Sequence, residues 1–183
     1  MQTTKSDRNL GAFLWIVLGI LGRLIPHPPN MTPMIPVALF GGSQLSRGRA
    51  FAVTFCTMAV SDAILAAVGR HQVFGYWSLF TYSGFALVVL AGMALRTVPT
   101  AGRTLGFLLA SSLFFWVWTN FGVWISGDGY PRTAEGLVSC YVAAIPFLGN
   151  ALIGDLGWGL ALFLSFHFLR KAAPRFGIAV QGA

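Results

Sequence analysis

Residues 50–69 read AFAVTFCTMAVSDAILAAVG, twenty residues in which Asp62 is the single charged side chain. An α-helix rises 1.5 Å per residue, so a helix of this length spans about 30 Å, the thickness of the hydrocarbon core of a bilayer. A run of this kind is typical of a transmembrane helix. The segment therefore predicts an integral membrane protein.

The composition of the whole chain agrees with this prediction. Hydrophobic residues make up 56% of the 183 positions and charged residues 9%, whereas soluble domains carry about 25% charged residues. Cut at charges and at Gly/Pro clusters, the apolar runs cover roughly 10–25, 33–46, 50–69, 76–95, 104–126 and 137–169. We expect one all-α membrane domain over 1–183, with cytoplasmic tails at 1–9 and 171–183 and a bundle of six transmembrane helices at about 10–170.

Two of these runs depart from an ordinary crossing. The run 137–169 is too long for one span, and Pro146 with Gly149 predicts an interfacial segment, 137–147, followed by a span from about 148. The run 33–46 is too short to cross alone and follows the Pro-rich residues 26–30, PHPPN. If that segment reaches membrane depth, it must be shielded by protein or line a wet cavity, because lipid satisfies no backbone groups.

Lysine and arginine residues fall unevenly on the two sides of the predicted bundle. A positive-inside bias places the richer side, and with it both termini, in the cytoplasm. The same bias explains the net charge of +7 without a nucleic-acid partner, because the basic residues form no stripe. The richer side carries Lys5, Arg8, Arg47, Arg49, Arg96, Arg103, Arg170, Lys171 and Arg175, and the other side carries Arg23, Arg70 and Arg132.

Asp62 and Asp155 are the only carboxylates inside the predicted spans. Each costs about 2.5–3.5 kcal/mol at a helix centre on insertion scales, so each needs a compensating partner or a function. In the predicted topology Asp62 lies ~10 Å below the outer surface and Asp155 at a similar depth. Asn120 and Asn150 fall in the same outer layer of their helices.

Polar residues gather above this layer, in the predicted outer connections. We infer an outward-facing cavity for a small polar molecule, in which arginines meet an anionic group and Trp124, Tyr130 and Tyr141 stack on a ring. Cys140 fits either a pocket wall or a buried small hydrophobe. The predicted ligand-binding residues are Arg23, His27, Asn30, Asp62, Arg70, Asn120, Trp124, Tyr130, Arg132, Cys140, Tyr141, Asn150 and Asp155.

Two other interpretations of the carboxylates stay open. In the first, the chain is a structural or accessory membrane protein, and Asp62 and Asp155 pair with arginines to lock helices together. In the second, it is an intramembrane enzyme, although Ser61-Asp62 and Leu152-Ile153-Gly154-Asp155 are defective forms of the aspartyl protease motifs. No metal-ligand spacing and no Gly-rich phosphate loop occurs, so we expect no cofactor, no metal and no enzyme.

The run Arg23-Leu24-Ile25-Pro26-His27-Pro28-Pro29-Asn30, continued by Thr32-Pro33 and Ala38-Leu39-Phe40-Gly41-Gly42, resembles an uncharacterised family of small bacterial inner-membrane proteins. Ser61-Asp62, Asn120-Phe121-Gly122-Val123-Trp124, Cys140-Tyr141 and Gly154-Asp155 fit the same pattern. That family is similar to the S components of energy-coupling factor (ECF) vitamin transporters.

The resemblance implies a six-helix substrate-capture protein of the bacterial inner membrane that binds a vitamin-like molecule near the outer face. It also implies that the partners are the small-molecule ligand, the lipid bilayer, and a membrane T component with ATPases. S components often dock through an Ala-x-x-x-Ala pair in the first helix, and here the first helix offers Gly19 and Gly22 as its small pair.

Overall fold

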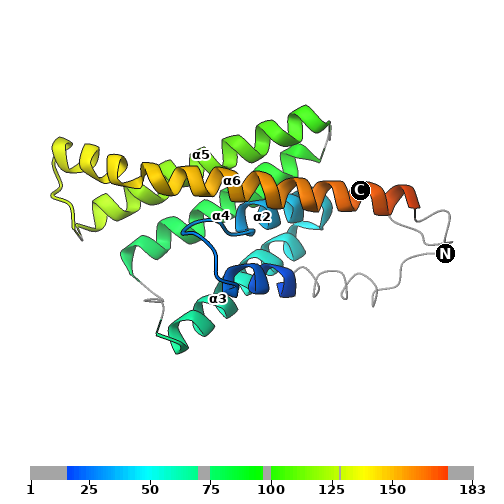
Figure 1. The fold of residues 1–183 in the computed structure, drawn as a ribbon, viewed down its shortest axis with the longest axis horizontal. Coiled ribbons are helices and arrows are strands. Elements are labelled where there is room, and N and C mark those ends of the chain that lie inside the picture. Colours follow the sequence, from blue (N-terminus) through cyan, green and yellow to red (C-terminus); the bar gives the residue numbers. More distant parts are fainter. Residues whose placement is uncertain (1–15, 70–74, 97–99, 128, 173–183) are drawn as a thin grey trace.

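The computed structural model describes residues 16–69, 75–96, 100–127 and 129–172 (Figure 1). All regular secondary structure in these ranges is helical, which confirms the all-α prediction, and the bounds of the five complete helices lie within three residues of the predicted runs. After a helical segment at 16–24, the elements are α2 (Met34–Gln44), α3 (Arg47–Ala67), α4 (Tyr76–Leu95), α5 (Ala101–Ser126) and α6 (Ala134–Ala172).

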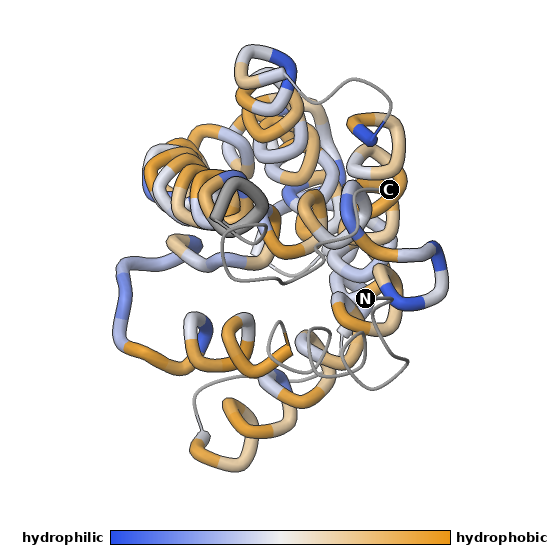
Figure 2. The backbone as a smooth tube through the Cα atoms, turned by 90° about the vertical axis from the view of Figure 1, so that its right-hand side faces the viewer, coloured by the Kyte–Doolittle hydropathy of each residue, from blue (hydrophilic) through white to orange (hydrophobic). Residues whose placement is uncertain are grey.

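Four of these helices, α3 to α6, are long and apolar enough to cross a membrane. Their exposed residues include many large apolar side chains, among them Leu79, Val138, Ile153 and Phe168. Figure 2 shows this apolar colouring along the helices, with hydrophilic residues at their ends and in the connections. Such surfaces are stable against lipid chains and unfavourable in water.

Helix α2 occupies the centre of the bundle. It has 11 residues, about 16 Å, so it is too short to cross alone. Ten of the 11 are buried, and α2 contacts α3, α4, α5 and α6. Its close approach to α4 requires glycine on both sides, because a Cβ at Gly42 would lie 2.2 Å from the Val89 carbonyl oxygen and one at Gly92 would lie 2.2 Å from that of Leu39.

Helix α6 runs without interruption through Pro146. The predicted change from an interfacial segment to a span near residue 148 was therefore wrong. Proline removes one backbone N–H and displaces one carbonyl, whereas a complete break would leave several backbone groups unpaired in an apolar setting. At 39 residues, or about 58 Å, α6 is longer than the hydrocarbon core is thick.

Arginine side chains gather at one end of the bundle. Arg96, at the end of α4, donates from Nη2 to the carbonyls of Gly42 and Leu45, at the end of α2. Because short connections lead from α2 to α3 and from α4 to α5, Arg47 and Arg103, in the first turns of α3 and α5, lie at this same end. Figure 1 shows the opposite end of the α5–α6 hairpin extending beyond the other helices.

Candidate functional site

A cavity of about 510 Å³ lies between the Pro-rich segment and helices α2, α3, α4, α5 and α6. Its volume is in the range of small-molecule binding pockets. Six of the thirteen predicted site residues line it: Arg23, His27, Asn30, Asp62, Asn120 and Asp155. The Pro-rich segment forms one wall of this cavity, and Pro26, Pro28, Pro29 and Asn30 are themselves exposed.

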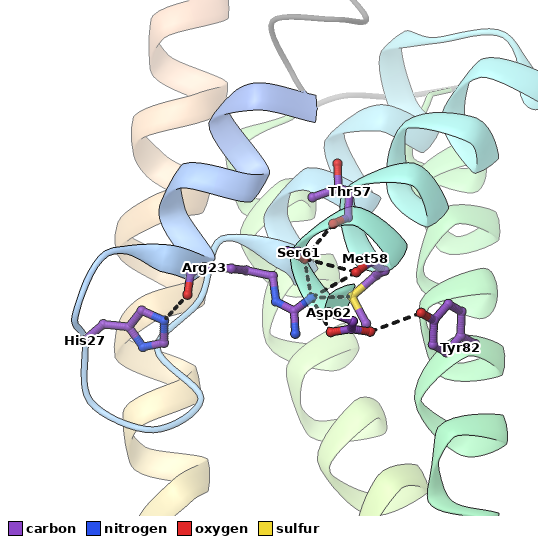
Figure 3. Close-up of polar contacts among 7 residues, drawn as sticks. All are labelled: Arg23, His27, Thr57, Met58, Ser61, Asp62 and Tyr82. Atoms are coloured by element: carbon purple, nitrogen blue, oxygen red, sulfur yellow. Dashed lines mark hydrogen bonds and ion pairs between the residues drawn. The ribbon is translucent and has the colours of Figure 1, made fainter. Parts of the chain in front are cut away.

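An ion pair joins the first helical segment to α3 at this cavity. Arg23 Nη1 lies 2.8 Å from Asp62 Oδ1, and the two side chains are 12% and 7% exposed. The same guanidinium nitrogen donates to the Ser61 hydroxyl and to the Met58 carbonyl, the latter at 3.4 Å, as Figure 3 shows. On the other oxygen of Asp62, the Tyr82 hydroxyl donates at 3.0 Å from α4. Asp62 therefore ties together three segments of the chain.

Glycines allow the first helical segment to pack closely beside this ion pair. A Cβ at Gly19 would lie 2.6 Å from Cγ2 of Thr57, and one at Gly22 would lie 2.5 Å from Cγ of Pro33. The small pair that the sequence offered as a docking surface thus faces α3 and the start of α2 within the same chain.

Asp155 lies on the opposite wall and differs from Asp62 in its partners. It is 3% exposed, and its Oδ2 accepts a 2.6 Å hydrogen bond from the Ser112 hydroxyl of α5. In the described part of the chain Ser112 is its hydrogen-bond partner and no cation pairs with it, since the ion pair there is Arg23–Asp62. One carboxylate of the cavity is compensated by an arginine, and the other is not.

The Pro-rich segment is held on both sides of the cavity. The His27 ring nitrogens lie 2.8 Å from the Pro28 carbonyl and 3.3 Å from the Arg23 carbonyl. On α6, a Cβ at Gly154 would lie 2.9 Å from Cα of Met31, so the absence of a side chain there lets Met31, the residue after the Pro-rich segment, contact the helix one residue before Asp155. In the Gly154-Asp155 motif, the glycine therefore allows a close backbone contact, and the residue that follows it places a carboxylate in the cavity lining.

Helix α5 contributes a stripe of residues to the cavity. Ser112, Phe115, Trp116 and Thr119 follow the i, i+3, i+4, i+7 spacing of one helix face, and Asn120 lies beside them. Trp116 Nε1 donates to the Ala144 carbonyl at 3.0 Å, which fixes the indole ring between α5 and α6. The Asn120 amide donates to the Trp116 carbonyl at 2.7 Å, so its side-chain oxygen remains an acceptor.

Several lining residues were not predicted from the sequence, because the predicted polar and aromatic site residues were chosen by their expected depth. The cavity also contains Trp77, Thr81 and Phe85 on α4, besides the α5 stripe. These three recur at i, i+4 and i+8, and Met58, Asp62 and Leu65 of α3 recur at i, i+4 and i+7. Counting along the sequence at helical spacing from Asp62 and Asn120 would have identified the residues of α3 and α5 that line the cavity.

The structure places six predicted residues outside the cavity lining. Trp124 Nε1 donates to the Pro131 carbonyl at 3.0 Å, and Arg132 Nη2 to the Ser126 carbonyl at 3.3 Å, so both belong to the turn of the α5–α6 hairpin. The Tyr141 hydroxyl donates to the Val117 carbonyl at 2.8 Å. Cys140, buried beside the Asn120 carbonyl, and the half-buried Tyr130 and Asn150 complete this set, while Arg70 lies outside the described residues.

The continuous α6 explains this separation. With α6 beginning at Ala134, Asp155 lies 21 residues, or about 31 Å, from its start, whereas the predicted span from 148 placed it ~10 Å deep. The hairpin therefore carries its tip residues away from the carboxylates. Among the described residues, no three His, Cys, Asp or Glu side chains are grouped to hold a metal ion.

We compared the chain with known proteins. No curated protein and no solved structure matches it. A model of a family of unknown function, DUF6580, matches residues 3–176, nearly the entire chain. The chain therefore belongs to the DUF6580 family.

Proposed function

We propose that this protein is a membrane-embedded subunit that captures a small, vitamin-like molecule at the extracytoplasmic face of the bacterial inner membrane, for transport. The observation that carries this proposal is the 510 Å³ cavity. It is lined by the Pro-rich segment and by residues of helices α2 to α6, and both Asp62 and Asp155 belong to its lining. Concave sites of this size, with apolar walls and a few convergent polar groups, are typical of ligand-binding pockets.

The proposed orientation has the arginine-rich end of the bundle in the cytoplasm, and with it both termini. Arg47, Arg96 and Arg103 lie at this end, in agreement with the positive-inside rule. Asp62 lies five residues before the end of α3, so the cavity is nearer to the opposite end of that helix. In this orientation the ligand enters from outside the cell. We retain six crossings, in which α2 and the Pro-rich segment together make the second.

Asp62 and Asp155 have different roles in this proposal. Asp62 is paired with Arg23, so its charge stabilises the packing of the first helical segment on α3. That is the structural role considered from the sequence, and it applies to one of the two residues. Asp155 has a hydroxyl partner and, among the described residues, no cation, so its carboxylate is available to a ligand.

The contacts favour a binding protein over an intramembrane protease. Two catalytic carboxylates must share a proton, which requires them to face each other closely. Here the Asp62 oxygens bond Arg23 and Tyr82, and Asp155 bonds Ser112. No hydrogen bond in the described part of the chain joins the two carboxylates.

A T component with ATPases is the partner that the S-component resemblance implies. Gly19 and Gly22, the small pair of the first helix, are already covered by Thr57 and Pro33. A docking mode that uses this pair would have to separate the first helical segment from the bundle. We therefore propose that capture does not depend on such a module, and that any energising partner contacts another surface.

Native mass spectrometry of the protein extracted from its own membrane in mild detergent tests the proposal. We expect an adduct with the mass of a small molecule. A matched pair of variants locates it: Ala151 lines the cavity and Ala143 is exposed on the same helix. Ala151→Phe should abolish the adduct and Ala143→Phe should retain it. Equal retention by both variants, or no adduct on the wild-type protein, would contradict the proposed site.

A further inference from the structure

The charges around the cavity are unequal. Among the described lining residues, leaving His27 aside, the charged side chains are Arg23, Asp62 and Asp155. Arg23 and Asp62 form an ion pair and neutralise each other, so the Asp155 carboxylate is the charge without a partner of opposite sign. A carboxylate that is 3% exposed and lacks a cation is costly to keep ionised unless a positively charged group is supplied from elsewhere. A ligand that enters the cavity is in a position to supply it.

The hydroxyl and amide groups of the lining also favour a donor on the ligand. Thr81 donates its hydroxyl hydrogen to the Trp77 carbonyl, and Thr119 donates its own to the Phe115 carbonyl. Ser112 is within donor distance of both the Leu108 carbonyl and Asp155. With their hydrogens donated to partners within the protein, these oxygens are left as acceptors for a ligand.

The two described arginines among those expected to bind an anionic group, Arg23 and Arg132, already have partners within the chain. Arg23 bonds Asp62 and Ser61, and Arg132 bonds the Ser126 carbonyl at the hairpin turn. The aromatic residues of the lining, Phe85, Phe115 and Trp116 among them, suit a cation with an apolar body, because aromatic rings attract cations in desolvated sites.

Resting on the proposed function, we infer that the cavity selects a cationic ligand, a small amine or a protonated nitrogen heterocycle, whose N–H group bonds Asp155. The cation replaces the missing partner of the carboxylate, and its donors meet the acceptor oxygens of α4 and α5. An anionic ligand would bring a second negative charge against Asp155 and leave its own acceptors opposite acceptors.

Three indoles of similar size and different charge test this inference: tryptamine as the cation, indole-3-ethanol as the neutral compound and indole-3-acetate as the anion. Binding to the purified protein is measured by equilibrium dialysis, up to 10 mM of each compound. We expect tryptamine to bind at least tenfold more tightly than indole-3-ethanol, because a hydrogen bond between charged groups is stronger than a neutral one. Asp155→Asn should reduce this ratio to below threefold, whereas Ala143→Phe, at an exposed position on the same helix, should leave the ratio unchanged.

The possible outcomes separate the two proposals. Tighter binding of indole-3-acetate, equal binding of all three compounds, or a tryptamine preference that survives Asp155→Asn would overturn the cation inference and leave a binding cavity. Failure of all three compounds to bind the wild-type protein, or binding unaffected by Ala151→Phe, would contradict the proposed function itself.

Discussion

The ion pair between Arg23 and Asp62 predicts an asymmetry between the two buried aspartates. Asp62→Asn keeps the size and one acceptor oxygen of the side chain but removes its charge. Arg23, 12% exposed, is then left with neutral partners only among the described residues. We expect a loss of about 3–5 kcal/mol in the free energy of unfolding, the range measured when one member of a buried pair is removed.

Coulomb's law gives a similar magnitude. Two unit charges about 4 Å apart attract by about 4 kcal/mol at an effective dielectric constant of about 20. Asp155→Asn removes no cation partner and leaves an acceptor oxygen for the Ser112 hydroxyl. Its expected effect on stability is therefore below about 1 kcal/mol.

The assay is equilibrium unfolding in detergent, followed by tryptophan fluorescence, without added ligand. Together with the single variant Arg23→Gln, the double variant Arg23→Gln, Asp62→Asn completes a thermodynamic cycle. We expect the double variant to be more stable than Asp62→Asn alone, because neither charge of the pair remains. Equal stability losses for Asp62→Asn and Asp155→Asn would refute the assignment of Asp62 as structural and Asp155 as free. A double variant less stable than both Arg23→Gln and Asp62→Asn would refute it as well.

Two further predictions concern the Pro-rich segment and the topology. Gly154→Ala should displace Met31 and the adjoining Pro-rich segment, because the new Cβ would lie 2.9 Å from Cα of Met31. We expect retention of the co-purified ligand, measured by mass spectrometry, to fall at least fivefold. Gly157→Ala is the control and should leave retention unchanged, because a Cβ there has nothing within 4 Å. In a cysteine-free background, a membrane-impermeant thiol reagent added to intact cells should label Arg132→Cys and not Arg103→Cys; the reverse pattern would invert the proposed orientation.

The sequence predicted the helices well because their signal is local. A run such as 76–95 is apolar along its length and bounded by polar residues and glycine, and α4 has the same bounds. The path of α6 was harder to predict, because Pro146 and Gly149 are local break signals whose effect depends on what surrounds them. In a non-aqueous setting one lost hydrogen bond is less costly than an open backbone.

The cavity was predictable in part. Asp62, Asp155 and Asn120 stand out as polar residues in apolar runs, and all three line one cavity. The pairing of Asp62 with Arg23 was one option among several arginines, because sequence gives no distance between segments 39 positions apart. Trp124 and Arg132 were assigned to the site from their predicted depth alone, and depth does not show how far the α5–α6 hairpin extends.

The most direct test of the capture function is an experimental density map of the protein purified from its own membrane. The account predicts a compact, non-lipid molecule inside the 510 Å³ cavity, in contact with Asp155 and Trp116, with the Arg23–Asp62 pair intact. A cavity closed by side chains, or filled by an acyl chain continuous with the surrounding lipid, would contradict it.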